Sequence, residues 1–466
     1  MSKFNSDLGF EKIEEALEKK SSCVHFVGVG GVGMYSLFNL TRARGIMATG
    51  SDKKQSLFTK RLIERGEDVR VGEYLEALKK ATLVVFTLAV AEDDPEILRA
   101  AELGIPLCSR AEYLAYLSKG YKIKISVSGS HGKSTVSAML YDVLNHSGQM
   151  VSAVSGAMLS SGSEPFKIGG RDYLVFEGCE YKDSFLKFSP TYSLFTNLEL
   201  DHTDYFKTLD DIKSSFLSAI ERACVSFVNI DDENLKSLIP KAKSKIISYG
   251  TSKGAVYRAV NISHTGGCYS FTVERMGETV AEIKLSVIGS FSVLNALGAF
   301  AVADYIGIDP GAAAKILSSF SGIERRLQKI GERNGAPVIY DYAHHPSEIK
   351  AAYYAVREIY KGRINAVFKA HTYTRTKDLW DGFVESLMLF DRVFLSEVDG
   401  IRESEIKGIN SQALANAIGN GAEALSDTEI ISSLESVDGA VLIMGAAELE
   451  GIKNALYKIL DKSIMQ

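Results

Sequence analysis

A glycine-rich loop between a strand pattern and a helix pattern constrains this chain most. The predicted strand, Tyr121 to Val127, alternates with β-branched residues, and the predicted helix runs from Lys133 to about Leu144 with apolar residues at helical spacing. Such a loop can cradle phosphates, because glycines let backbone N–H groups approach them and the helix start adds partial positive charge. We therefore predict a nucleotide-phosphate site in which Lys133 binds the β- and γ-phosphates and Ser134 ligates Mg²⁺.

The loop is shorter than the usual phosphate-binding pattern. The first glycine of G-x-x-x-x-G-K-[ST] would fall at position 127, which is Val127, so the loop reads G-x-x-G-K-S. A purely structural glycine turn is the alternative interpretation. The predicted phosphate contacts are Gly129, Ser130, His131, Gly132, Lys133, Ser134 and Thr135.

Composition limits the class of protein. The 466 residues are too many for one core and predict about three domains. A net charge of −5 argues against a nucleic-acid binder, and the five cysteines are scattered without a C-x-x-C pair, as in reduced cytoplasmic proteins. No apolar run has membrane-spanning length, and the polar start lacks a signal-peptide core. We expect a cytoplasmic protein with no membrane or nucleic-acid partner.

Strand and helix patterns alternate along the chain, which predicts an α/β fold in three domains. We expect a Rossmann-like domain over residues 1–118 and a central nucleotide-binding α/β domain over residues 119–321. The central domain contains a β-rich insert from Val256 to Ile288. Residues 322–466 form a second Rossmann-like domain, in which four predicted strands each precede a helix.

The N-terminal domain carries a dinucleotide-type fingerprint. Gly28, Gly30 and Gly33 form G-x-G-x-x-G after a predicted strand, and Asp52 follows about 20 residues later, where an acid can bind a ribose hydroxyl. The pattern does not separate NAD from any other diphosphate ligand. A structural strand–helix turn remains the alternative.

Two further polar segments lie at the ends of predicted strands of the central domain, Tyr173–Glu177 and Tyr192–Leu198. One is Glu177-Gly178-Cys179-Glu180, and the other contains Asp201-His202-Thr203-Asp204. Clustered carboxylates with one imidazole near a phosphate loop suit a hard cation. Helix capping by Asp201 or Asp204 is the alternative for the second segment.

The C-terminal domain places polar residues after two of its predicted strands. These segments are Asp341-Tyr342-Ala343-His344-His345-Pro346 and His371-Thr372-Tyr373-Thr374-Arg375-Thr376. Loops at the carboxyl ends of parallel strands meet at one sheet edge, so they predict a polar site there. Arg325-Arg326 either contacts phosphate or is a solvated pair.

Taken in order along the chain, these motifs resemble the Mur ligases. The two C-terminal loops are specific to the branch that joins L-alanine to UDP-N-acetylmuramate. The resemblance implies domains for the UDP-sugar, for ATP and for the amino acid. It also implies an ATP-dependent reaction through an acyl phosphate in peptidoglycan precursor synthesis, with Mg²⁺ as cofactor.

The same resemblance implies roles for individual residues. Lys133, Glu177, His202, His344 and Arg375 would carry catalysis, and Ser134, Glu177 and His202 would hold Mg²⁺. Asn295, Arg326 and Asp341 would join the loop in binding ATP. The UDP-sugar would contact Gly28, Gly30, Gly31, Gly33, Met34, Ser51 and Asp52. Tyr342, His344, His371 and Arg375 would surround the amino acid.

The sequence departs from the family pattern at Phe291-Ser292, where members carry His-Asn, and at Glu73, where they carry His. Three alternatives stay open. One is a ligase that attaches a wall peptide, as in murein peptide recycling, and another is a non-catalytic UDP-sugar binder. The third, which rests on the N-terminal glycine pattern alone, is an NAD-dependent oxidoreductase. We expect a monomer or a homodimer.

Overall fold

The computed structural model describes residues 8–18, 21–91, 93–159, 164–400, 403–419, 421–447, 449–458 and 460. It contains three α/β domains, each built on its own sheet. Its residues group into two compact units. Unit 1 comprises residues 1–196, 214–228 and 235–247, and unit 2 comprises residues 197–213, 229–234 and 248–466. No helix among the described residues is both long enough and apolar enough to cross a membrane.

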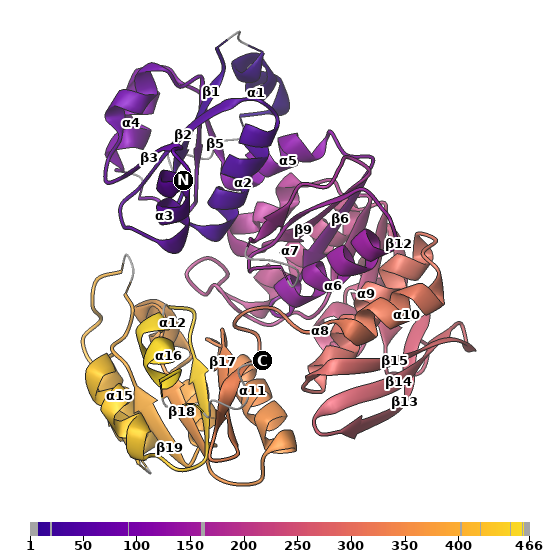
Figure 1. The fold of residues 1–466 in the computed structure, drawn as a ribbon. Coiled ribbons are helices and arrows are strands. Elements are labelled where there is room, and N and C mark those ends of the chain that lie inside the picture. The colour runs from indigo at the N-terminus through magenta and orange to yellow at the C-terminus, as the bar shows by residue number, and fades with distance from the viewer. Residues whose placement is uncertain are drawn as a thin grey trace. The chain divides into compact units, whose positions relative to one another are not determined.

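The N-terminal domain is a five-stranded parallel sheet in unit 1, with strand order β3-β2-β1-β4-β5 (Figure 1). One face of the sheet buries Val27, Val84 and Phe86 against Ile97 of α4. The elements are α1 (Phe10–Leu17), β1 (Cys23–Val27), α2 (Val32–Ala43), β2 (Met47–Asp52), α3 (Leu57–Glu64), β3 (Asp68–Val71), η1 (Leu75–Lys79), β4 (Leu83–Phe86), α4 (Pro95–Glu102), β5 (Leu107–Ser109) and α5 (Arg110–Ser118).

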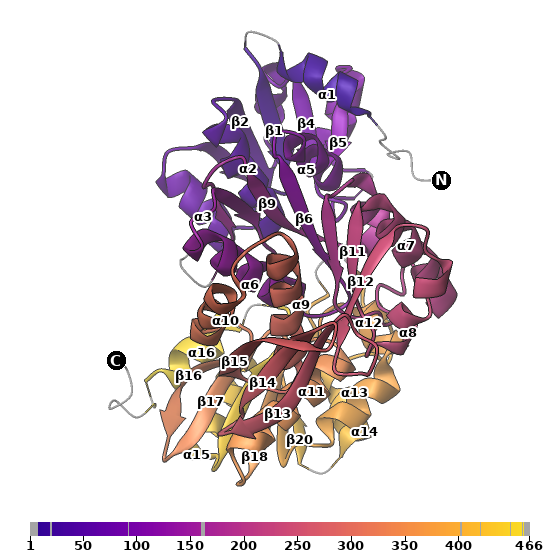
Figure 2. The ribbon, with the colours of Figure 1, turned by 90° about the vertical axis from the view of Figure 1, so that its right-hand side faces the viewer.

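The middle domain contributes strands β11-β10-β6-β9-β7-β8 to unit 1, in that order, and Figure 2 shows β6 beside β9. The helix after β6 is buried along most of its length because its apolar residues recur at helical spacing. The elements are β6 (Ile123–Ser128), α6 (Lys133–His146), β7 (Val151–Val154), β8 (Phe166–Lys167), β9 (Tyr173–Gly178), η2 (Tyr181–Lys187), β10 (Tyr192–Phe195), α7 (Leu209–Arg222) and β11 (Val225–Asn229).

The rest of the middle domain contains the predicted β-rich insert as antiparallel strands β13, β14 and β15 of unit 2. Helix α9 packs on them, and the carboxylate of Asp304 joins helix to insert by accepting from Tyr257 Oη (2.6 Å) and Arg275 Nη1 (2.8 Å). The elements are α8 (Glu233–Lys236), η3 (Ile239–Lys241), β12 (Lys245–Gly250), β13 (Tyr257–Thr265), β14 (Cys268–Arg275), β15 (Glu278–Ile288), α9 (Phe291–Tyr305) and α10 (Pro310–Ser319).

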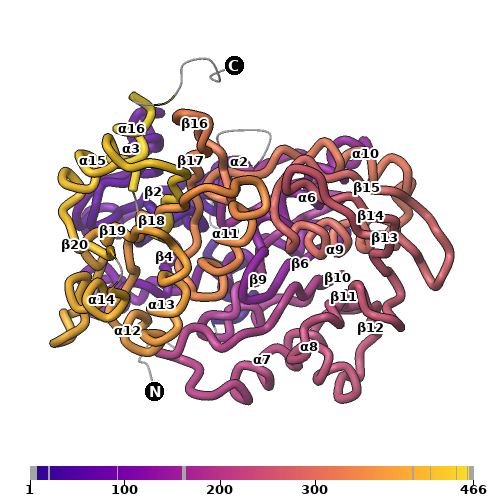
Figure 3. Tube along the Cα trace, turned by 90° about the horizontal axis from the view of Figure 1, so that it is seen from below, coloured from indigo at the N-terminus to yellow at the C-terminus, as the bar shows by residue number. Residues whose placement is uncertain are grey.

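The C-terminal domain is a six-stranded sheet of order β16-β17-β21-β18-β19-β20, parallel except for β16. Helices α11, α13 and α14 pack on one face, and α15 and α16 on the other (Figure 3). The elements are β16 (Gln328–Arg333), β17 (Ala336–Asp341), α11 (Pro346–Ile359), β18 (Ile364–Phe368), α12 (Tyr373–Asp378), α13 (Trp380–Leu387), β19 (Arg392–Leu395), α14 (Ser411–Ile418), β20 (Ala422–Ala424), α15 (Asp427–Ser436), β21 (Ala440–Met444) and α16 (Glu450–Leu456).

One predicted strand is too long. The sequence favours a strand from Tyr192 to Leu198, but β10 ends at Phe195. After Phe195, the backbone groups of Leu198 form hydrogen bonds with side chains and not with a neighbouring strand. Asp232 accepts from the Leu198 N–H at 3.0 Å, and Asn234 donates to the Leu198 carbonyl at 2.8 Å.

Candidate active site

The phosphate loop joins β6 to α6 in unit 1, as the sequence predicts. Gly129 and Gly132 adopt φ values of +142° and +83°, which side-chain-bearing residues rarely reach, so the loop requires glycine at both positions. Thr196 at the end of β10 donates from Oγ1 to the His131 carbonyl at 2.7 Å and fixes the loop from outside. Ser134 lies buried in the first turn of α6.

An ion pair holds the loop lysine. Lys133 Nζ lies 3.0 and 3.1 Å from the two carboxylate oxygens of Glu180, and it also donates to the Gly129 and Ser130 carbonyls. Burial alone would lower the pKa of Lys133, but the Glu180 carboxylate more than offsets this and raises the pKa above its ordinary value. The lysine therefore carries a full positive charge at the place where phosphate oxygens would bind.

Glu177 lies one residue before the end of β9 and contacts the loop that follows β7. Its Oε1 accepts from Ser155 Oγ at 3.0 Å and from the Gly156 N–H at 2.5 Å. Its Oε2 has no hydrogen-bond partner among the residues that the structure describes. A carboxylate oxygen in this position and the Ser134 hydroxyl are both hard donors, so they fit Mg²⁺ by their chemistry.

The N-terminal glycine loop is tied to the acid predicted from the fingerprint. The Gly30 N–H donates to Asp52 Oδ2 at 2.9 Å, which joins the loop to the end of β2. Gly28 has φ +85°, and a Cβ there would lie 2.6 Å from Thr87 Cγ2. The remaining predicted contacts are Gly31 and Gly33 at the start of α2, and Met34, which is buried.

A buried polar network engages another residue predicted to contact the UDP-sugar. The Ser51 hydroxyl donates to Glu96, and Glu96 also accepts from the Tyr74 N–H and lies 3.6 Å from His25 Nε2. Burial opposes ionisation of Glu96, yet these hydrogen bonds lower its pKa below the ordinary value. The Ser51 hydroxyl therefore stabilises the N-terminal domain, whatever its role toward a ligand.

In unit 2, an aromatic and cationic cluster forms at the carboxyl end of β17. The Tyr342 ring lies under the guanidinium groups of Arg325 and Arg326, 4.7 and 5.0 Å from the ring centroid. Asp341 is buried, which raises its pKa, and it accepts from the backbone N–H groups of Leu327 (2.6 Å) and Ala343 (2.7 Å). These bonds fix the loop that carries Tyr342.

His344 belongs to the same cluster and is fixed from two sides. Its Nδ1 lies 3.1 Å from Glu348 Oε2, and its ring stands edge-on to Tyr342 at 5.2 Å and to His371 at 6.4 Å. His371 Nδ1 is buried without a hydrogen-bond partner among the described residues. Burial and the neighbouring positive groups lower the pKa of His371 to about 4, so its ring is neutral at pH 7.

Arg375 in α12 forms an ion pair with Asp201, from the segment after β10. Nε and Nη2 of Arg375 lie 3.3 and 3.0 Å from Asp201 Oδ1. Burial opposes ionisation of Asp201, but Arg375 holds its pKa far below the ordinary range. His202 follows with a left-handed backbone (φ +54°), and its N–H donates to Asp201 Oδ1 at 2.7 Å.

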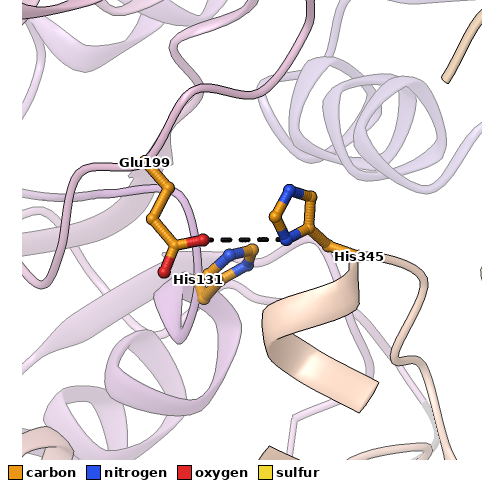
Figure 4. A group of neighbouring side chains, drawn as sticks. All are labelled: His131, Glu199 and His345. Carbon is orange, nitrogen blue, oxygen red and sulfur yellow. Dashed lines mark ion pairs between the residues drawn. The ribbon is translucent and has the colours of Figure 1, made fainter. Parts of the chain in front are cut away.

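A second contact links the same segment to the start of α11. Glu199 Oε2 accepts from Ser347 Oγ at 2.8 Å and lies 3.6 Å from His345 Nδ1, the contact marked by the dashed line in Figure 4. The His345 side chain also caps α11, because it accepts from the Ser347 N–H. His345 therefore has a structural role in this helix start.

The predicted site residues fall in both units. The glycine loops, Lys133, Ser134 and Glu177 belong to unit 1, whereas His202, Asn295, Arg326, Asp341 and the predicted amino-acid contacts belong to unit 2. Asn295 lies buried on α9. The pairing of Glu177 with His202 around one Mg²⁺ stays a prediction.

Two charged partners were not predicted as site residues. Glu180 stands in the predicted Glu177–Glu180 segment and is nearly fully buried, with its side chain 1% exposed. Asp201 stands in the predicted Asp-His-x-Asp segment. The sequence shows that both segments are acidic, but only the structure shows that Glu180 pairs with Lys133 and Asp201 with Arg375.

Family models match three successive parts of the chain. They are described as the Mur ligase family, catalytic domain (residues 23–122), the Mur ligase middle domain (residues 127–303) and the Mur ligase, glutamate ligase domain (residues 325–447). Their order agrees with the three sheets.

Curated relatives match along nearly the whole chain. The UDP-N-acetylmuramate–L-alanine ligase of Caldicellulosiruptor bescii is 37% identical over 452 residues, 95% of this chain and 99% of that protein. The ligase of the same name from Clostridium tetani is 36% identical and covers 91% of this chain and 96% of its own.

Solved structures share the fold. The UDP-N-acetylmuramate–alanine ligase of Thermotoga maritima aligns with a TM-score of 0.79 at 25% identity, over 93% of this chain and 98% of that one. A murein peptide ligase from Psychrobacter arcticus aligns with a TM-score of 0.73 at 23% identity, over 96% of this chain and 100% of that one.

Proposed function

This chain belongs to the Mur ligase family, and from that premise we propose that it joins L-alanine to UDP-N-acetylmuramate with hydrolysis of ATP to ADP and phosphate. The observation that carries the proposal is identity of 37% along nearly the full length of an L-alanine ligase. Such a reaction supplies a peptidoglycan precursor, and we expect it in the cytoplasm, where ATP and UDP-sugars are made.

The chemistry begins with a carboxylate that is a poor acyl donor. An oxygen of the muramate carboxylate attacks the γ-phosphate of ATP, so that ADP leaves and an acyl phosphate forms. The amine of L-alanine then attacks the acyl carbon, loses a proton and displaces phosphate to give the amide. Phosphoryl transfer depends on positioning and charge neutralisation. We assign these tasks to Lys133 and Arg326, with the phosphate loop orienting the nucleotide.

For Lys133 this assignment implies that phosphate oxygens join Glu180 as its partners. The ammonium now neutralises the Glu180 carboxylate. Phosphate oxygens that approach the loop would share the three N–H donors of Lys133 with Glu180. Glu180 thereby keeps the lysine protonated and directed at the loop.

We assign Ser134, Glu177 and His202 to Mg²⁺, which would neutralise phosphate charge when bound. Asn295 and Asp341 are assigned to the adenosine. The N-terminal loop residues Gly28, Gly30, Gly31, Gly33 and Met34, with Ser51 and Asp52, are assigned to the UDP-sugar. The amino acid is assigned to Tyr342, His344, His371 and Arg375, where the neutral His371 ring can accept a hydrogen bond from the amine.

Phosphate release from Mg-ATP with UDP-N-acetylmuramate tests the proposal. We expect release that requires both the sugar nucleotide and L-alanine, and none with a wall tripeptide as the acceptor. Release with the tripeptide alone would make the chain a peptide ligase. If phosphate is released with neither L-alanine nor the tripeptide, although the protein binds nucleotide, the chain is a non-catalytic relative.

Lys133→Ala tests the division of labour between domains. We expect phosphate release to fall at least about a thousandfold, because the γ-phosphate loses its cationic partner. Affinity for UDP-N-acetylmuramate, measured by calorimetric titration, should stay within about twofold. Loss of sugar-nucleotide binding in this variant would contradict the assignment of the N-terminal loop.

A further inference from the structure

The segment after β10 meets the C-terminal domain through every second residue. Glu199 accepts from Ser347 at 2.8 Å, Asp201 pairs with Arg375, and Thr203 Oγ1 donates to Asp378 Oδ2 at 2.5 Å. All of these residues belong to unit 2. Of the three contacts, the ion pair is the one shielded from water, since its side chains are 14% and 9% exposed.

Asp201 engages one edge of the Arg375 guanidinium. Oδ1 accepts from Nε at 3.3 Å and from Nη2 at 3.0 Å, and Oδ2 lies 3.3 Å from Nη2. Nη1 donates to no residue that the structure describes. A guanidinium has five N–H donors in a planar fork, so the Nη1–Nη2 edge can still bind a second carboxylate with two parallel bonds.

The neighbours of Arg375 suit an α-amino acid. The positive charge of Arg375 acts on the ring of His371, which stands edge-on to His344. The His371 ring is neutral, and its buried Nδ1 has no hydrogen-bond partner among the described residues. Arg375, which has a free edge for a carboxylate, therefore has as a neighbour a neutral imidazole that can bind an amine.

We propose that Asp201 is a positioning residue: it fixes the Arg375 guanidinium so that the Nη1–Nη2 edge binds the α-carboxylate of the incoming amino acid. The inference rests on the proposed function, which assigns Arg375 to the amino acid, and deepens it by naming the residue that orients Arg375. Without Asp201, the long arginine side chain would sample several rotamers, and each carboxylate bond would carry an added entropic cost.

Asp201 also has a second contact that the test must separate. Its Oδ1 accepts from the His202 N–H at 2.7 Å, next to a left-handed residue. A role limited to His202 would affect every acceptor equally. A role through Arg375 would affect only acceptors that carry a carboxylate.

The experiment compares L-alanine with L-alaninamide, which keeps the amine and lacks the carboxylate. The measured quantity is kcat/KM for L-alanine divided by kcat/KM for L-alaninamide, at saturating ATP and UDP-N-acetylmuramate. For Asp201→Asn we expect this ratio to fall about tenfold, the value of one charge-assisted hydrogen bond. We expect the rise in KM to be confined to L-alanine, with KM for ATP unchanged.

Asp378→Ala is the matched control, since it removes the exposed neighbouring contact with Thr203. It should leave the ratio within twofold. If Asp201→Asn does not fold, Arg375→Lys replaces it, because lysine keeps the charge but has no fork to orient. It too should lower the ratio about tenfold.

An unchanged or increased ratio in Asp201→Asn, or an equal loss with both acceptors, would overturn the inference. Failure of the proposed function is a distinct result, because the unmodified protein would then show no phosphate release dependent on L-alanine.

Discussion

Two buried cations at the site are each matched by a carboxylate. Lys133 meets Glu180, and Arg375 meets Asp201. An isolated charge in a protein interior costs several kcal/mol, so these acids keep their cations ionised where they are buried. Among the residues that the structure describes, His371 Nδ1 has no hydrogen-bond partner, and this buried ring is neutral instead.

The low pKa of His371 predicts a loss of stability in acid. Its folded pKa of about 4 lies below the unfolded value near 6.5, so the unfolded chain binds the extra proton. The stabilisation is fully present above pH 6.5 and is lost as the pH falls toward 4, by at most about 3 kcal/mol. Urea unfolding of the protein and of His371→Gln at pH 7, 5.5 and 4.5 measures this, and the variant should show a shallower pH dependence. Equal slopes for both proteins would contradict it.

At the scale of single residues, the sequence predicts cations better than their partners. Lys133 is identified by its place between a glycine and a helix start, which is a local pattern. Glu180 and Asp201 are 47 and 174 residues from the cations they meet. No local pattern carries that information, since the contacts depend on how the sheets order their strands.

The start of α2 depends on two adjacent glycines in different ways. A Cβ on Gly30 would lie 2.8 Å from Asp52 Oδ2 and from Ser56 Oγ, whereas a Cβ on Gly31 would have the Gly28 carbonyl oxygen as its nearest neighbour, at 3.6 Å. Gly31 also has an ordinary φ of −78°. The loop therefore requires glycine at position 30 for close packing and tolerates a side chain at position 31.

We expect Gly30→Ala to lower the free energy of unfolding by about 1–3 kcal/mol, the usual cost of overpacking. It should also weaken binding of UDP-N-acetylmuramate, because Asp52 must move. Gly31→Ala is the control and should cost clearly less stability. Chemical denaturation measures the free energy of unfolding of both variants. Equal losses in the two would show that glycine is needed at position 30 for its backbone freedom and not for its close contact with Asp52.

The sequence patterns predict most helices and strands, and where a predicted strand end differs from the structure, a physical cause can be named. The predicted helix from Lys133 is confirmed as α6, and the predicted β-rich insert is confirmed as β13 to β15. The end of β10 is the exception. Leu198 is an apolar residue that suits a strand, but the side chains of Asp232 and Asn234 form hydrogen bonds with its backbone. Strand propensity is a local quantity and does not account for such contacts with residues distant in the sequence.

At the scale of the whole molecule, the three-domain α/β fold is predicted from the alternation of strand and helix patterns and is confirmed by three sheets. The boundaries at residues 118 and 321 stay a prediction. The sequence does not indicate that residues 197–213 belong to the compact unit that contains the C-terminal domain. Within that unit, Glu199, Asp201 and Thr203 contact the C-terminal domain, and these contacts form only in the folded chain.

Separate hydrophobic cores predict more than one unfolding transition. The N-terminal sheet packs one core around Val84 and Phe86, and the C-terminal sheet packs its own on both faces. A ligand stabilises only the part that binds it, by about 2.7 kcal/mol at one hundred times its dissociation constant. In scanning calorimetry we expect UDP-N-acetylmuramate to raise one transition, and to raise it equally in Lys133→Ala. A non-hydrolysable ATP analogue should raise a different transition, and that rise should disappear in Lys133→Ala. A single transition raised by both ligands would instead mean that the domains unfold as one cooperative unit, so that binding at one sheet stabilises the others.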